Sequence, residues 1–337
     1  MVLVKIVGEL PYSDKTLVVD LEADVSGGAA LVGPNLTGKS LMLQCLYAMA
    51  GQRIGRPIRP PQGLRCEVET TDYTGIYVDA YRVVAQLYEV AVQESLGRIM
   101  EDAEVLTNAK DEDIKRLGED LRIATRKIRS VLGDLHFVLN AKQRADDLLV
   151  SEAVGLLNEL YAEWTKKAEE ARSEFRDIFD DFFPLVLSAT ADGFVWTDKK
   201  ADTAGRGLRQ LSTAFSPALV ALYAVYAYAI PETVYLLVEE PEVHAHPLMA
   251  YFLGAYLRRL VEKSRITPSR RGRLNIVVST HSFDFLRGFW DEGVKVYVLK
   301  RLIEDGKVLL KVAGQWQGEG YVPGFSDTAI YKLLGLR

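Results

Sequence analysis

The segment from Gly33 to Ser40 constrains the fold of this chain more than any other. It reads GPNLTGKS and matches the pattern GxxxxGK[ST] at every fixed position. An apolar, strand-like run precedes it at 29–33, and a helical stretch follows at about 39–50. In this order, strand, loop and helix aim backbone N–H groups and the helix N-terminus at phosphate oxygens. The segment therefore predicts a phosphate-binding loop within an α/β sheet.

Two side chains of this loop have separate expected roles. Lys39 places a positive charge near the β- and γ-phosphates of a nucleotide, and the hydroxyl of Ser40 can bind Mg²⁺. ATP and Mg²⁺ are thus the expected ligands. The candidate nucleotide-binding residues of this region are Gly33, Pro34, Asn35, Leu36, Thr37, Gly38, Lys39, Ser40 and Leu41.

A second motif is an apolar strand that ends in carboxylates, VYLLVEEPE, from Val234 to Glu242. Beside a phosphate loop, one acid of such a pair lies near the metal and the next can deprotonate the attacking water. We assign Glu239 to the metal and Glu240 to the general base. An exposed acidic strand end is the alternative interpretation.

Two further segments carry polar groups that suit phosphate chemistry. His281 directly follows the apolar run NIVV and Ser279-Thr280, so it lies at the ligand-binding edge of a parallel sheet and can hydrogen-bond a γ-phosphate. Further upstream, QLSTAFSP ends in Ser216 and Pro217, a good cap and first-turn pair for the apolar helix expected at 216–230. Such a helix start favours anions.

The pattern along the chain divides it into an α/β part and a helical insertion. Strand-like runs occupy 2–7, 16–21 and 29–33, and strands alternate with helices again from residue 184 onward, which indicates a mainly parallel sheet. We expect one split domain, residues 1–84 and 184–337, and an inserted helical arm at 85–183. Within the insertion, apolar residues recur every three or four positions and predict a helix from about 113 to 150, in an arm whose apolar stripes face each other. An ordinary all-α subdomain is the alternative.

The composition is that of a folded, non-membrane chain. Its 337 residues are 48% hydrophobic and 26% charged, with a net charge of -5, which argues against bulk electrostatic coating of nucleic acid. Basic clusters at 51–65 and 258–273 leave local contacts open. We expect neither a signal peptide nor a membrane span. Cys45 and Cys66 are too few for a disulfide framework or a zinc site, so we expect a reducing cytoplasm.

The order of these motifs resembles that of ABC-type ATPases of the SMC/RecF/OLD kind. EEPEVHAHP and STHSFDFL are especially similar to segments of OLD-like prokaryotic ATPases. The resemblance implies a P-loop NTPase fold of ABC-ATPase type, with a mainly parallel sheet, antiparallel N-terminal strands and a long inserted helical arm. It also implies a homodimer in which two copies engage head to tail around ATP. Ser212 would then contact the γ-phosphate held by the other copy's Lys39.

The chain departs from the usual forms of these motifs at two positions. Glu239 stands where an aspartate is usual, and Ala214 stands where the signature has glycine. The lid residue stays open between Arg82 and Gln86. His244 and His246 form an HxH pair. We expect this pair to lie at the protomer interface rather than to bind a metal.

These observations predict an ATPase that acts as a molecular switch. ATP drives dimerisation, and Glu240, His281 and Lys39 promote its hydrolysis to ADP and phosphate. The output is DNA repair or maintenance, or control of a partner effector. A non-catalytic, ATP-gated scaffold and the ATPase subunit of a defence or toxin system are the alternatives.

Overall fold

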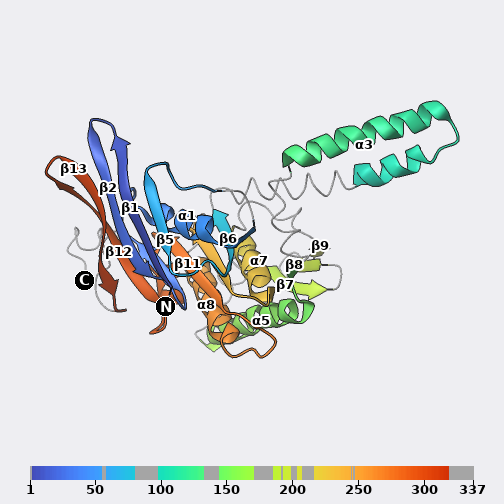
Figure 1. Ribbon diagram of the computed structural model, residues 1–337. Coiled ribbons are helices and arrows are strands. Elements are labelled where there is room, and N and C mark those ends of the chain that lie inside the picture. Colours follow the sequence, from blue (N-terminus) through green and yellow to red (C-terminus); the bar gives the residue numbers. More distant parts are fainter. Residues whose placement is uncertain are drawn as a thin grey trace.

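The computed structural model describes most of the chain and places it around one large sheet (Figure 1). The described residues are 2–54, 58–79, 98–132, 144–170, 185–190, 193–198, 203–206, 216–243, 245 and 247–318.

The large sheet has ten strands, and six neighbouring strands at one side of it run parallel. These are, in spatial order, β4 (Gln52–Ile54), β6 (Thr74–Asp79), β10 (Val234–Glu239), β11 (Leu274–Thr280), β3 (Ala29–Val32) and β12 (Lys295–Glu304). Their carboxyl ends therefore meet at one edge, where ligands bind in open α/β sheets.

The rest of the sheet is built mainly from antiparallel pairs. It continues with β13 (Lys307–Trp316), β2 (Lys15–Asp24), β1 (Leu3–Tyr12) and β5 (Leu64–Val68). Only β13 and β2 pair in parallel within this group. A separate three-stranded sheet contains β7 (Leu185–Thr190), β8 (Gly193–Asp198) and β9 (Thr203–Arg206). The expected α/β class, mainly parallel with antiparallel N-terminal strands, is confirmed.

Two hydrophobic cores lie on opposite faces of the large sheet because strand side chains alternate between its faces. On β10, Tyr235 and Leu237 face the core of α1, while Leu236 and Val238 face the core of the other helices. The helices are α1 (Lys39–Met49), α3 (Glu112–Leu132), α5 (Asp147–Glu170), α7 (Ser216–Ala229), α8 (Pro247–Ser264) and α9 (Phe283–Phe289).

The helical insertion contains two different parts. α5 packs its buried side chains, including Leu149 and Leu157, into the same core as α7 and α8, whereas α3 projects away from the body (Figure 1). The single helix expected over 113–150 is wrong, because Ala145 and Asp146 are not helical. The Asp146 carboxylate instead caps α5 by accepting from the backbone N–H groups of Leu148 and Leu149, at 2.8 and 3.3 Å.

The apolar stripe of α3 also differs from expectation in its described part. Ile114 and Leu117 are 42% and 60% exposed. The contact with the preceding helical segment, 98–107, runs instead through Gly118, where a Cβ would lie 2.7 Å from the backbone N of Thr107. The glycine lets the two backbones approach closely, so the larger apolar side chains are turned outward.

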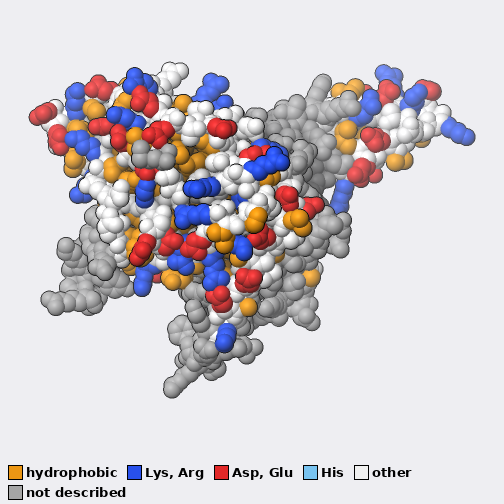
Figure 2. Space-filling view, turned by 60° about the horizontal axis from the view of Figure 1, so that its bottom comes forward, with side chains coloured by type: hydrophobic (Ala, Val, Ile, Leu, Met, Phe, Trp, Pro, Cys, Tyr) orange, Lys and Arg blue, Asp and Glu red, His pale blue; other side chains and the backbone are white. Residues whose placement is uncertain are grey.

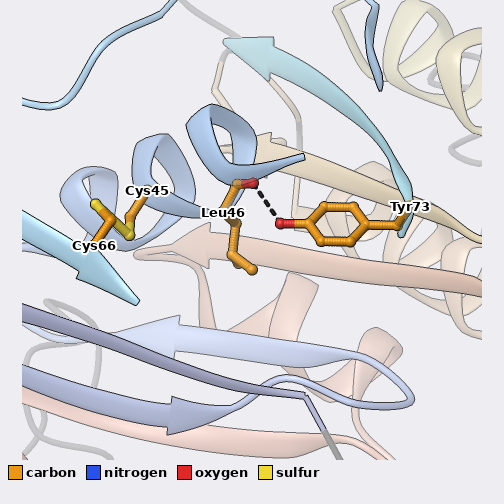
Figure 3. Close-up of a disulfide and its surroundings, with 4 residues drawn as sticks. All are labelled: Cys45, Leu46, Cys66 and Tyr73. Carbon is orange, nitrogen blue, oxygen red and sulfur yellow. Dashed lines mark hydrogen bonds between the residues drawn. A yellow bond between two sulfur atoms is a disulfide. The ribbon is translucent and has the colours of Figure 1, made fainter. Parts of the chain in front are cut away.

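Cys45 and Cys66 form a disulfide that joins α1 to β5 (Figure 3). Their Cα atoms are 5.7 Å apart, within the usual range for such bonds. The sequence analysis found two cysteines too few for a disulfide framework and did not predict this single bond. Packing of α1 on the sheet brings together the two residues, which are separated by 21 positions. Because the two cysteines are paired, their small number is no longer an argument for a reducing compartment.

The described surface mixes both charge signs. Figure 2 shows Lys and Arg interspersed with Asp and Glu over the body, and apolar side chains among the charges of the projecting arm. None of the helices in the described part of the chain combines the length and apolar character needed to cross a bilayer.

Candidate nucleotide-binding site

The loop between β3 and α1 has the geometry of a phosphate cradle. Gly33 and Gly38 adopt φ angles of +145° and +95°, which favour glycine. A Cβ on Gly33 would lie only 2.4 Å from the carbonyl oxygen of Leu299 in β12, so the loop is packed against that strand. The Thr37 hydroxyl donates to the Pro34 carbonyl at 2.8 Å and holds the turn closed.

Lys39 lies buried within this loop, with 6% of its surface exposed. Its ammonium donates to the carbonyl oxygens of Gly33 and Pro34, both at 2.9 Å. Burial lowers the pKa of Lys39 to about 8, and the carboxylates of Glu240, Glu242 and Glu239 partly offset this effect. An incoming phosphate would replace neutral carbonyls with anionic oxygens and favour the charged amine.

Ser40 and Glu239 meet although 199 positions separate them, and the hydroxyl donates to Oε1 of the carboxylate. A hydroxyl and a carboxylate are hard oxygen donors that suit Mg²⁺, which usually takes one or two carboxylates and completes its shell with water and substrate phosphates. The pair therefore fits the expected metal. Within the described residues, no group of three or more His, Cys, Asp or Glu side chains is arranged to hold a metal by itself.

Glu240 and His281 lie together at the carboxyl ends of β10 and β11. Glu240 has a φ of 48°, and its backbone N–H donates to the Ser279 carbonyl at 2.8 Å. Its Oε1 is 3.5 Å from Nε2 of His281. The left-handed turn at Glu240 directs the chain away from the sheet directly after the metal-side Glu239.

Glu242 is a half-buried residue of this edge that the sequence argument did not single out. Its Oε1 accepts from the backbone N–H groups of His281 and Ser282, at 2.6 and 3.1 Å. Burial raises the pKa of the Glu242 carboxyl, opposed by these hydrogen bonds. Glu242 thus ties the segment after β10 to the segment after β11.

A cavity of about 250 Å³ opens beside the loop and extends toward β1, β12 and β13. Asn35, Leu36, Thr37, Gly38, Lys39, Ser40, Leu41 and Glu240 line it, together with Tyr12, Leu17, Arg301 and Leu310. Sequence reasoning missed Tyr12 and Arg301, whose guanidinium Nη1 lies 3.4 Å from the tyrosine hydroxyl. An aromatic ring and a guanidinium suit a nucleobase.

Several predicted residues lie outside the described residues. These are Arg82, Gln86, Ser212, Ala214, His244 and His246. Ser216 and Pro217 do begin a helix, α7, as predicted.

The basic cluster at 258–273 is largely engaged within the chain. Arg259 makes a two-pronged contact with Glu163 at 3.1 and 2.6 Å, and Lys263 lies 3.5 Å from Glu152. Arg265 donates to the Gly27 carbonyl at 2.9 Å, while Arg270 is 8% exposed and donates to the carbonyl oxygen of Tyr228. These contacts reduce the charge that the cluster offers to nucleic acid.

Comparisons with known proteins give similarity at the level of overall structure only. No family model matches the chain, and no curated protein matches it. An SMC head domain from Thermotoga maritima aligns over 93% of this chain and 98% of its own, with 10% identity and a TM-score of 0.41. An SMC head with an extended coiled coil bound to the C-terminal domain of ScpA, from Pyrococcus furiosus, aligns over 99% of both chains, with 11% identity and a TM-score of 0.40.

An ABC transporter cassette described as bacterial and dimeric covers 95% of this chain and 100% of its own, with 14% identity and a TM-score of 0.40. The fold class itself follows from the strand order and from the phosphate loop between β3 and α1. These features define a P-loop fold with a mainly parallel sheet.

Proposed function

We propose that this protein is an ATP-binding and ATP-hydrolysing molecular switch. One observation carries the proposal: β3, β11 and β10 are neighbours, and bring Lys39, Ser40, Glu239, Glu240 and His281 to one edge of the sheet. The cavity at this edge is lined by the phosphate loop and by Glu240.

In the proposed reaction, the Glu240 carboxylate accepts a proton from the water that attacks the γ-phosphate. Lys39 and His281 stabilise the charge that develops on the phosphoryl oxygens. Ser40 and Glu239 would hold Mg²⁺, which would neutralise further negative charge on the phosphates. The products are ADP and phosphate.

The switch itself is a homodimer that forms around ATP, with Ser212 of one copy on the nucleotide of the other. The open cavity beside the loop supports this arrangement, because a second surface is needed to enclose a bound triphosphate there. In the proposed division of the chain, residues 1–84 and 184–337 form the ATPase and 85–183 the insertion. The projecting α3 is the part that transmits engagement to DNA or to an effector protein.

A non-catalytic, ATP-gated scaffold is the second candidate, and the glutamate at position 239 favours it. The longer side chain in place of the usual aspartate changes where the metal-side carboxylate lies. A scaffold would bind ATP and dimerise without releasing phosphate.

Phosphate release by purified wild-type protein and by Glu240→Gln separates the two candidates. The enzyme proposal expects release from the wild type to exceed that of the variant by about a hundredfold or more, as for the loss of a general base. Binding of a fluorescent ATP analogue should be equal in both proteins. Equal, background-level release with retained binding would establish the scaffold instead.

A further inference from the structure

Tyr77, in β6, contacts the oxygen of the metal-side carboxylate that Ser40 does not contact. β6 and β10 are parallel neighbours, and their register pairs Tyr77 with Leu237, two residues before Glu239. The tyrosine is 6% exposed, and its hydroxyl donates to Oε2 of Glu239 at 2.6 Å. Both oxygens of Glu239 are therefore engaged, Oε1 by Ser40 and Oε2 by Tyr77.

The position of the Tyr77 ring is itself fixed by α1. Tyr47 packs edge-on against it, with ring centroids 5.8 Å apart. The helix that carries Ser40 thus orients the tyrosine that holds Glu239.

A glutamate at this position needs such a constraint more than an aspartate does. It has one more rotatable bond, so its carboxylate samples more positions and loses more entropy when a metal fixes it. A hydrogen bond from a buried hydroxyl to a carboxylate is charge-assisted and restricts those positions. The observed pair selects one orientation, with Oε1 directed toward Ser40.

We propose that Tyr77 is a positioning residue that holds the Glu239 carboxylate in place for the Mg²⁺ of a bound nucleotide. The inference rests on the proposed nucleotide function. It concerns the affinity for the metal, which is measurable apart from turnover.

The test measures binding of a fluorescent ATP analogue as MgCl₂ is titrated, starting from EDTA. Tyr77→Phe keeps the ring and removes the hydroxyl. Binding in EDTA should equal that of the wild type, while the Mg²⁺ concentration for half-maximal enhancement should rise about tenfold, as expected for loss of one hydrogen bond to a charged group. Tyr73→Phe is the matched control, because this buried hydroxyl donates to the Leu46 carbonyl at 2.6 Å and not to Glu239 (Figure 3).

Glu239→Asp supplies the second arm and serves alone if Tyr77→Phe does not fold. Its shorter side chain moves the carboxylate away from Tyr77, so the Mg²⁺ requirement should rise although aspartate is a good metal ligand. Adding Tyr77→Phe to Glu239→Asp should change little further.

The outcomes separate the two claims. A wild type without Mg²⁺-enhanced ATP binding contradicts the proposed function. A wild type with it, and a Tyr77→Phe protein with the same Mg²⁺ dependence, overturns the positioning role alone. A Glu239→Asp protein that needs no more Mg²⁺ than the wild type also overturns that role.

Discussion

Lys39 illustrates how single residues of this site are held before a ligand arrives. Its ammonium satisfies two carbonyl oxygens of its own loop, which keeps the glycine-rich turn closed around a buried charge. Burial of the Lys39 ammonium costs free energy, and its lowered pKa reflects this cost. Few groups other than the loop carbonyls and the nearby carboxylates compensate the hydration that the ammonium loses. In the proposed function, a bound triphosphate supplies the missing negative charge.

The first prediction concerns the pH dependence of ATP affinity. The pKa of Lys39 is about 8 in the free protein. Bound phosphate favours the protonated amine, so binding above that pH requires proton uptake and weakens as pH rises. Affinity should fall about tenfold between about pH 7 and about pH 9, measured by calorimetry or analogue fluorescence.

Lys39→Gln is the control for this effect. Its residual affinity should be lower than that of the wild type at the lower pH and nearly constant over the same interval. A wild-type affinity that does not change with pH would contradict the buried, phosphate-facing lysine.

At the residue scale, contiguous sequence patterns pointed to side chains that lie together in the structure. The phosphate loop and the acidic strand end are short contiguous patterns, and their side chains do meet. Tyr77 and Arg301 carry no such pattern, since their relevance depends on strand pairing and on the position of the cavity wall. Glu242 lies within the acidic motif, but its link to His281 depends on the loop after β11.

At the scale of elements, α8 and α9 cross through glycines. A Cβ on Gly254 of α8 would lie 2.4 Å from the Phe285 carbonyl oxygen, and one on Gly288 of α9 would lie 2.1 Å from the Tyr251 carbonyl oxygen. The close crossing fixes α9, whose N-cap is Ser282, directly after His281. Helix packing therefore helps to position the candidate site.

The second prediction tests this crossing. Gly254→Ala should lower the free energy of unfolding by about 1–3 kcal/mol, because backbone atoms must move apart to accept the methyl group. Gly155→Ala in α5 is the matched control. No atom lies within 4 Å of its added Cβ, so it should be neutral or stabilise by up to about 1 kcal/mol. Urea denaturation measures both, and equal effects would contradict the packing.

The third prediction concerns the link between α1 and β5. Cys66→Ser should lower the free energy of unfolding by about 3 kcal/mol in the absence of reductant, because the disulfide restricts the unfolded chain over 21 positions. Wild-type protein in dithiothreitol should fall to the same level, and the variant should not respond to dithiothreitol. A reductant-insensitive wild type would show that the bond contributes nothing.

Element-level prediction from sequence was good for strands and weaker for the insertion. Apolar runs located the central strands β3, β10 and β11 because each of these three is buried on both faces. The apolar periodicity of the insertion did not reveal the break at Ala145 and Asp146, where a capping aspartate begins α5. Nor did it reveal Gly118, whose small size decides which face of α3 packs.

At the scale of the whole molecule, the site lies at an open edge of the sheet, and α3 projects from the body. An open site and a projecting arm are the parts that a nucleotide-dependent switch needs: one to engage a second copy and one to transmit the engagement. The surface in Figure 2 mixes both charge signs. Such a surface suits contact with a specific protein, or a local contact with nucleic acid, better than broad electrostatic binding of nucleic acid.

The mass of the particle in solution tests the proposed ATP-dependent dimer. Glu240→Gln protein, which should bind ATP without hydrolysing it, is measured by mass photometry or light scattering with Mg²⁺, with and without ATP. We expect the monomer mass of 37.6 kDa without ATP and twice that mass with it, and a return to the monomer when Ser212→Arg is added. A particle of unchanged mass at saturating ATP would contradict the proposed dimer.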